Sequence, residues 1–251
     1  MKILILAKQV PDTTDVALNG DFTLRRDLVS QIMNPADESA LEAGLLLRDQ
    51  NGGTATVMTM GPVRAERMLR EALSRGADEA VLLTHPAFAG SDTLATAKAL
   101  AAAVMALGGF DLILSGRRAA DGETGQVGPM LASLMNIACV ANATRLEMDG
   151  SFALADQLTE SGFFRWRMAL PALIAFCEWS YPLRLPSLTG LRRARQAEIR
   201  RFSPADLGLS PGECGLRGSP TRVIHVSARP AGARACRMLT VEELFSKGVL
   251  P

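Results

Sequence analysis

The chain has 251 residues, of which 48% are hydrophobic, 21% are charged and only 5% are aromatic. Its 27 basic and 26 acidic residues leave a formal charge of +1, so no broad positive field is available for nucleic acid. The composition indicates a globular protein with a sizeable core, and neither a membrane-spanning run nor a secretory leader is visible. We therefore expect a cytoplasmic protein that has no transmembrane segment and binds no nucleic acid.

Four short apolar runs in the first half of the chain predict β-strands. They cover residues 3–7, 54–60, 80–83 and 111–114, and each is followed by a segment with helical spacing. Such alternation is typical of an α/β protein with a doubly wound, mostly parallel sheet.

The helix after the first strand has the clearest start signal. Asn34 is predicted to be its N-cap, Pro35 its first helical residue and Asp37 an acid of its first turn. A second helix is expected to end at Gly76, and a third to begin after Ser91. All three helices should pack on the sheet.

The pattern changes in the second half of the chain. From residue 144 to 168 the apolar period shifts to two, with a turn at 149–151, which predicts a small antiparallel addition before a strand at 172–176. We therefore expect a compact domain over residues 1–181. Prolines recur through residues 182–251, which are predicted to form an extended C-terminal arm that packs on another subunit.

Several kinds of site are absent from the sequence. Lys8 and its neighbours stand where Gly-x-Gly-x-x-Gly would follow the first strand, and no Gly-x-x-x-x-Gly-Lys-Ser/Thr loop occurs. The four cysteines and two histidines lack metal-ligand spacing, so we assign no metal. No nucleophile elbow is present either, so we assign no catalytic residue.

A glycine-rich segment after the fourth strand is the predicted phosphate-binding loop. It consists of Asp121, Gly122, Glu123, Thr124, Gly125, Gln126, Val127 and Gly128, ahead of a helix face that begins with Met130. Glycines allow close approach of a ligand, and the N-terminus of a helix favours phosphate. Asp121 and Glu123 would repel phosphate, so they either accept hydrogen bonds from ribose hydroxyls or point to solvent. A turn with a helix cap is the alternative interpretation of this segment.

Other strand ends should converge on the same rim, because parallel strands present their carboxyl ends at one edge of a sheet. Ala7 and Lys8 follow the first strand, Met60 ends the second, and Asp92 and Thr93 follow the third. For Met60 alone, core packing is the better interpretation. For Asp92 and Thr93, helix capping is as good an explanation as ligand contact.

Taken together, these motifs resemble the β subunit of electron transfer flavoproteins. The matching segments are residues 8–12, 34–37, 41–42, 60–62, 76–78, 90–96 and 121–128, which span nearly the whole chain. The resemblance implies a Rossmann-like adenine-nucleotide-binding fold and a heterodimer with a larger α subunit that binds most of a redox FAD. It also implies that electrons pass between flavin-dependent dehydrogenases and acceptors.

The resemblance also implies a set of cofactor-binding residues in this chain. The nucleotide contacts carried over by the motifs are Ala7, Asn34, Asp37, Met60 and the loop from Asp121 to Met130. Lys8, Asp92, Thr93 and Thr96 complete the predicted cofactor-binding set.

The form of the loop and the segment from Cys214 to Thr221 are similar to the electron-bifurcating and nitrogen-fixation-associated branch of the family. That branch implies a second FAD in the β subunit, NADH as electron donor, and ferredoxin or flavodoxin among the acceptors. AMP, as in the single-flavin branch, is the alternative occupant. An ATP-binding or adenylate-forming enzyme on a similar fold is the alternative from another class, although its pyrophosphate loop is missing. A nucleotide-sensing module without redox chemistry is a third.

Residues 184–190 resemble the loop by which β subunits recognise their dehydrogenase. Leu188 stands at the position of the exposed apolar anchor and Arg184 opens the loop, so both are predicted partner-docking residues. Leu185 replaces a usual aromatic, and Thr189 and Gly190 follow the anchor, which leaves the identity of the partner open.

Overall fold

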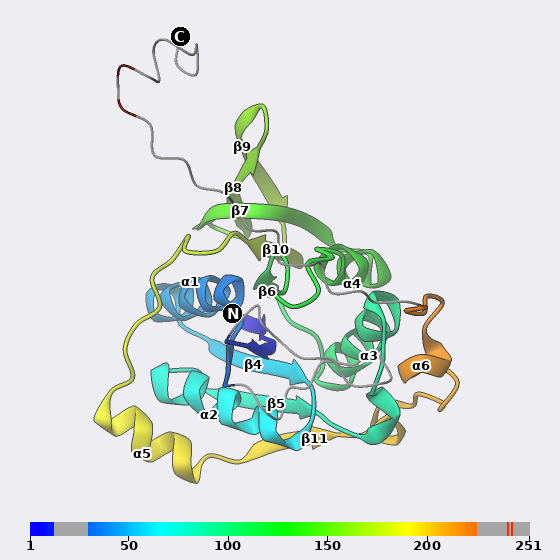
Figure 1. Cartoon of the computed structure of the whole chain (residues 1–251). Helices are drawn as coiled ribbons and strands as arrows, with labels where there is room; N and C mark the ends of the chain where they lie inside the picture. The colour runs from blue at the N-terminus through cyan, green and yellow to red at the C-terminus, as the bar shows by residue number, and fades with distance from the viewer. Residues whose placement is uncertain (13–29, 225–239, 241, 243–251) are drawn as a thin grey trace.

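A computed structural model describes residues 1–12, 30–224, 240 and 242, and its centre is a nine-stranded sheet (Figure 1). The strands of this sheet are β1 (Lys2–Leu6), β4 (Thr54–Met60), β5 (Glu79–Leu83), β6 (Leu112–Gly116), β7 (Ala138–Asp149), β8 (Phe152–Thr159), β9 (Gly162–Ala169), β10 (Ala172–Phe176) and β11 (Ile199–Phe202). Their spatial order is β11–β5–β4–β1–β6–β10–β7–β8–β9. A separate antiparallel pair consists of β2 (Gln9–Pro11) and β3 (Gln31–Met33).

The helices lie on both faces of the sheet. They are α1 (Pro35–Asn51), α2 (Glu66–Arg75), α3 (Thr93–Ala106), α4 (Val127–Met135), α5 (Leu188–Gln196) and the single turn α6 (Gly215–Gly218). Short 3-10 turns cover Val63–Ala65, Pro86–Phe88 and Ala205–Leu207. The expected α/β class and doubly wound sheet are confirmed, and the four predicted strands lie within two residues of the observed ones.

Two apolar clusters form the core, one on each face of the sheet. Ile3 and Ile5 pack into the cluster that contains the buried residues of α1 and α2. Leu4 and Leu6 point the other way, into the cluster beneath α3 and α4. This division follows from the period of two in a strand, and both faces of β1 are apolar because helices cover both.

The antiparallel addition is larger than the sequence indicated. Its first strand, β7, begins at Ala138 and pairs in parallel with β10 before it pairs antiparallel with β8. The register shifts between Ala143 and Arg145, next to Asn142, whose φ of 56° is unusual for a residue other than glycine. The addition thus continues the main sheet as β7, β8 and β9.

The chain after residue 181 contributes to the same body. Helix α5 packs on α2, and β11 pairs in parallel with β5, extending the main sheet at one edge. The rest of the predicted arm is described over residues 203–224, 240 and 242, and its packing on another subunit stays a prediction. No helix in the described part of the chain is long and apolar enough to cross a bilayer.

Candidate functional site

The candidate site lies where the strand order of the sheet reverses. From β1, the chain adds β4 and β5 on one side, and then returns to place β6 and β10 on the other side. Ligands of open α/β sheets bind at such a switch point, outside the carboxyl ends of the strands. At this point Ala7 and Lys8 follow β1, and the segment that leads to the glycine-rich loop follows β6.

Asp37 joins the ends of these two strands. One carboxylate oxygen accepts the backbone N–H of Lys8 at 2.7 Å, and the other accepts that of Gly116 at 2.8 Å. Gly116 has to be a glycine, because a Cβ there would lie 2.4 Å from an oxygen of Asp37. Burial raises the pKa of Asp37 to about 7, although the hydrogen bonds from Lys8, Asn34 and Gly116 act in the opposite direction.

Asn34 occupies the N-cap position of α1, but its side chain does not cap the helix. Its amide group donates to the carbonyl oxygen of Arg118 at 2.9 Å, and its carbonyl oxygen accepts the N–H of Ala120 at 3.0 Å. The predicted N-cap position is confirmed, but the segment after β6 takes both hydrogen-bonding groups of the side chain. Pro35 does stand at the start of the helix, as expected.

The two acids of the glycine-rich loop have different surroundings. Asp121 forms an ion pair with Lys8, with 2.5 Å between the carboxylate and the ammonium group, and its side chain is only 4% exposed. Glu123 is exposed and lies 3.6 Å from the guanidinium group of Arg118. The side chain of Asp121 thus points inward to Lys8, another of the predicted residues, and its negative charge offsets the positive charge of Lys8.

The loop leads directly into α4. Glu123 and Gly125 both have left-handed backbone conformations, with φ of 51° and 63°. Gln126 precedes the helix without capping it, and its side-chain oxygen accepts a hydrogen bond from the hydroxyl of Thr93 at 3.1 Å. The first N–H groups of a helix have no partner within the helix, so they are free to bind an anion. Gly122 and Thr124 are exposed beside them.

The first turn of α3 is fixed to a later segment of the chain. Asp92 caps α3 by accepting the N–H of Ala95 at 3.0 Å, and it also accepts the hydroxyl of Thr221 at 2.7 Å. Its own N–H donates to the hydroxyl of Ser219 at 2.8 Å. Capping therefore explains Asp92, and Thr96 lies one turn further along the same helix.

The remaining predicted residues pack against the core or lie elsewhere. Ala7 and Gly128 are buried, while Met60, Val127 and Met130 are half-buried against the cluster beneath α3 and α4. Leu188 is exposed at the start of α5, which packs on α2. Arg184 pairs with Glu42 and Asp49.

The sequence did not reveal an ionic cluster at the edge of the loop. Glu178, just after β10, pairs with Arg117 at 2.8 Å and with Arg118 at 3.3 Å. Arg117 and Arg118 were visible as an unusual basic pair, but nothing local connects them to a residue 60 positions later. Among the described residues, no group of three or more His, Cys, Asp or Glu side chains is placed to hold a metal ion.

An open hollow of about 550 Å³ lies near the amino ends of β1, β6 and β10, lined by residues that include Met1, Lys2, Asp111 and Pro171. The polar groups described above meet instead at the carboxyl ends of the strands. The chemistry therefore favours the carboxyl-end site, which combines a switch point, a glycine-rich loop and a helix N-terminus.

Comparison with known proteins gives a consistent result over most of the chain. A family model described as electron transfer flavoprotein domain matches residues 21–207. The electron transfer flavoprotein subunit beta of Thermoanaerobacterium thermosaccharolyticum is 42% identical over 243 residues, covering 96% of this chain and 92% of that protein.

Two other relatives have more specific names. The caffeyl-CoA reductase–Etf complex subunit CarD of Acetobacterium woodii is 40% identical over 97% of this chain and 95% of its own length. Protein FixA of Azorhizobium caulinodans is 41% identical over 97% of this chain and 90% of its own length.

Proposed function

The chain belongs to the electron transfer flavoprotein β-subunit family, and from that premise we propose that it works as the smaller subunit of a heterodimer. Together with an α subunit, it passes electrons between flavin-dependent dehydrogenases and acceptors. The observation that carries the proposal is the position of the glycine-rich loop at the switch point of the sheet, beside the end of β1.

An adenine nucleotide fits the chemistry of this loop. The N-terminus of α4 offers backbone N–H groups and a favourable dipole to phosphate oxygens. Because Asp121 pairs with Lys8, the loop does not present a free carboxylate at that position. A Cβ at Gly122 would meet no atom within 4 Å, so there is space for a ligand above the loop backbone.

We propose FAD, rather than AMP, as the nucleotide in this subunit. The loop from Asp121 to Gly128 and the segment from Cys214 to Thr221 support this assignment, as do relatives that include CarD and FixA proteins. When bound, FAD supplies one- and two-electron redox chemistry, with NADH as the donor of a hydride. The contributions of this chain are to bind the pyrophosphate at α4, to hold the loop through Asn34, and to fix the strand ends through Asp37.

Docking of a dehydrogenase is proposed for the segment that opens α5. Leu185 and Leu188 are 85% and 83% exposed, which is unusual for two large apolar side chains so close in sequence. Apolar side chains of this kind supply binding free energy when they enter a pocket of a partner.

The test is to co-purify the chain with the α subunit from its own genome, release the nucleotides by denaturation, and count FAD and AMP per heterodimer. Two FAD and no AMP are expected. One FAD and one AMP would retain the heterodimer and reject the second flavin. Absence of both a complex and flavin would reject the proposed function.

A variant of the loop tests where the nucleotide binds. Gly122→Val should fold normally, because the added atoms point into open space, but it should lower the nucleotide content attributed to this subunit. Gly212→Ala is a matched control, since a Cβ there meets only the hydroxyl of Ser210, at 3.9 Å. Unchanged nucleotide content in Gly122→Val would argue against this loop as the site.

A further inference from the structure

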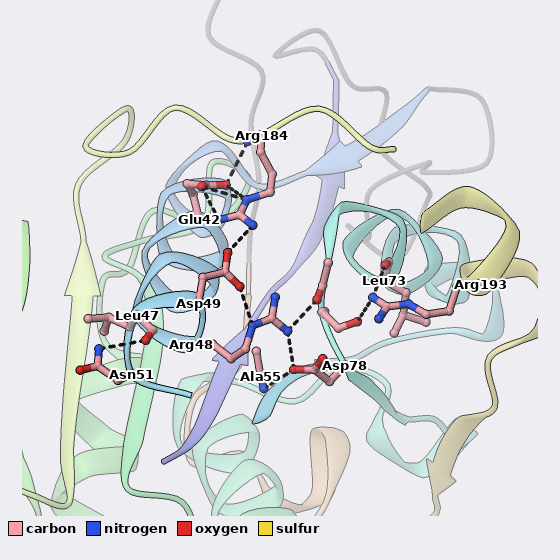
Figure 2. Close-up of polar contacts among 12 residues, drawn as sticks. Glu42, Leu47, Arg48, Asp49, Asn51, Ala55, Leu73, Asp78, Arg184 and Arg193 are labelled. Atoms are coloured by element: carbon pink, nitrogen blue, oxygen red, sulfur yellow. Dashed lines mark hydrogen bonds and ion pairs between the residues drawn. The ribbon is translucent and has the colours of Figure 1, made fainter. Parts of the chain in front are cut away.

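The segment between β10 and α5 is held to α1 through one buried carboxylate. The side chain of Glu42 is 6% exposed and faces Arg184 (Figure 2). Its oxygens accept the backbone N–H and the Nε–H of Arg184 at 3.0 Å, and Nη2 of the guanidinium group lies 3.0 Å from one of them. Glu42 therefore fixes both the backbone and the side chain of a single residue.

The guanidinium group of Arg184 has a second partner on the same helix. Its Nη1 lies 2.7 Å from one carboxylate oxygen of Asp49, and the other oxygen of Asp49 accepts a hydrogen bond from Arg48 at 2.8 Å. The guanidinium group of Arg48 also forms an ion pair with Asp78, with 2.6 Å between its Nη1 and a carboxylate oxygen. Positive and negative groups therefore alternate across the end of α1 (Figure 2). Partial burial alone would raise the pKa of Asp49, but the hydrogen bonds from Arg184 and Arg48 outweigh it and lower that pKa.

Helix α2 holds the other side of the segment. Arg75 donates to the carbonyl oxygen of Arg184 at 2.5 Å, so both backbone groups of Arg184 are bound. Further along, Arg193 donates to the carbonyl oxygens of Leu73 and Ala77, at 3.2 and 2.9 Å. Within α5 only Ala194 is buried. Charged hydrogen bonds therefore contribute much of the attachment between this segment and the domain.

Leu183 of the same segment packs against the core, but the three leucines that follow it do not. Leu185 and Leu188 are exposed, as is Leu191 one turn further along. Because Arg184 lies next to Leu185 and four residues before Leu188, fixing its backbone fixes the path of the chain that presents both side chains. A preorganised segment binds more tightly because less conformational entropy is lost on docking.

We propose that Arg184 and Glu42 are positioning residues for docking, and that Arg184 acts on the partner through Leu188 rather than by direct contact. This inference rests on the proposed docking function of Leu188. Independently of any partner, the Glu42–Arg184 pair holds residues 184–196 in one conformation on α1 and α2.

The experiment uses the heterodimer and the variants Glu42→Gln and Arg184→Lys. Amide hydrogen exchange of residues 184–196, followed by mass spectrometry, should accelerate about tenfold or more in Glu42→Gln, while exchange in the sheet strands stays unchanged. Arg184→Lys keeps the charge but loses the planar fork, so it should give an intermediate effect. Asp149→Asn removes an exposed ion pair with Arg167 in the antiparallel addition and is the matched control.

Docking is read from the rate at which a flavin-dependent dehydrogenase of the same genome reduces the heterodimer. In Glu42→Gln the KM for that dehydrogenase should rise severalfold with kcat unchanged, and reduction by dithionite should be unaffected. Unaltered exchange in both variants would overturn the inference. Faster exchange with an unaltered KM would overturn the docking role of the pair.

Leu188→Ala separates this inference from the proposed function. It should raise the KM for the dehydrogenase without altering exchange, because Leu188 is exposed and the ion pairs remain. If Leu188→Ala leaves the KM unchanged, the docking function of the segment is rejected. The exchange data would still decide whether Glu42 holds the segment.

Discussion

At the scale of single residues, two opposing effects act on the ionisation of the buried carboxyl group of Asp37. Both of its oxygens accept backbone N–H groups, which favours the ionised form, yet burial is the larger effect and raises its pKa to about 7. In the unfolded chain a carboxyl group of this kind ionises near pH 4. The folded protein therefore holds this proton over a range of pH in which the unfolded chain has released it.

This difference predicts a pH dependence of stability. As the pH rises from about 4 to about 7, the unfolded state gains from ionisation of Asp37, so the folded state should lose up to about 4 kcal/mol of relative stability. Asp37→Asn abolishes the titration, so the stability difference between wild type and variant should shrink or reverse over this range. Urea unfolding of both proteins at pH 5 and pH 8 measures it, and parallel curves would contradict the prediction.

Ser115 is a second residue whose environment makes a clear prediction. Its Oγ is buried at the end of β6, next to the first turn of α4, and has no hydrogen-bond partner in the described part of the protein. A buried polar group without a partner destabilises a fold by about 1–3 kcal/mol.

Ser115→Ala should therefore leave the free energy of unfolding unchanged or raise it by about 1 kcal/mol. Ser74 is the matched control, because it is equally buried but donates to the carbonyl oxygen of Glu71 at 2.7 Å. Ser74→Ala should lower the stability by about 1 kcal/mol in the same denaturant titration. Equal losses in both variants would mean that the hydroxyl of Ser115 is hydrogen-bonded in solution.

At the scale of elements, α5 depends on one close approach to α2. A Cβ at Gly190 would lie 2.1 Å from the carbonyl oxygen of Ser74, a backbone atom that cannot easily move. Gly190 is the third residue of α5, and its small size permits this close packing of α5 on α2.

Gly190→Ala should consequently displace α5 from α2. We expect a loss of about 1–3 kcal/mol in stability and faster trypsin cleavage at Arg192 and Arg193, both of which lie on α5. Gly212→Ala, where a Cβ has room, should match the wild type. Wild-type cleavage rates in Gly190→Ala would show that the backbone relaxes without moving the helix.

The composition of each element explains which strands the sequence could predict. Strands β4 and β10 were predicted with their observed bounds, because each is a buried apolar run between clear breaks. Strand β11 was missed, since its four residues include two exposed arginines, and an edge strand of that composition has no apolar period. The side-chain partners of Asn34 could not be predicted, because Arg118 and Ala120 lie more than 80 residues away.

At the scale of the whole molecule, alternation of strands and helices predicted the doubly wound class, but not the order of strands. The switch point exists because β6 returns to the far side of β1, which is a pairing between residues more than 100 positions apart. Local patterns carry no information about such a pairing. The glycine-rich loop and Thr93, which bonds to it through Gln126, could thus be placed on one rim from the sequence, whereas its neighbour Glu178 had to come from the structure.

Helix α1 connects two regions: Asn34 and Asp37 hold the segment after β6 that leads to the glycine-rich loop, and Glu42 and Asp49 hold Arg184 ahead of α5. A chimera that receives residues 184–196 from a relative would therefore combine a foreign residue at position 184 with the Glu42 and Asp49 of this chain. A donor segment without an arginine at position 184 would leave Glu42 buried and unpaired, which is strongly destabilising. Under the proposed docking role, we expect the exposed leucines to vary with the partner during evolution, whereas Glu42 and Arg184 should be exchanged together or kept together.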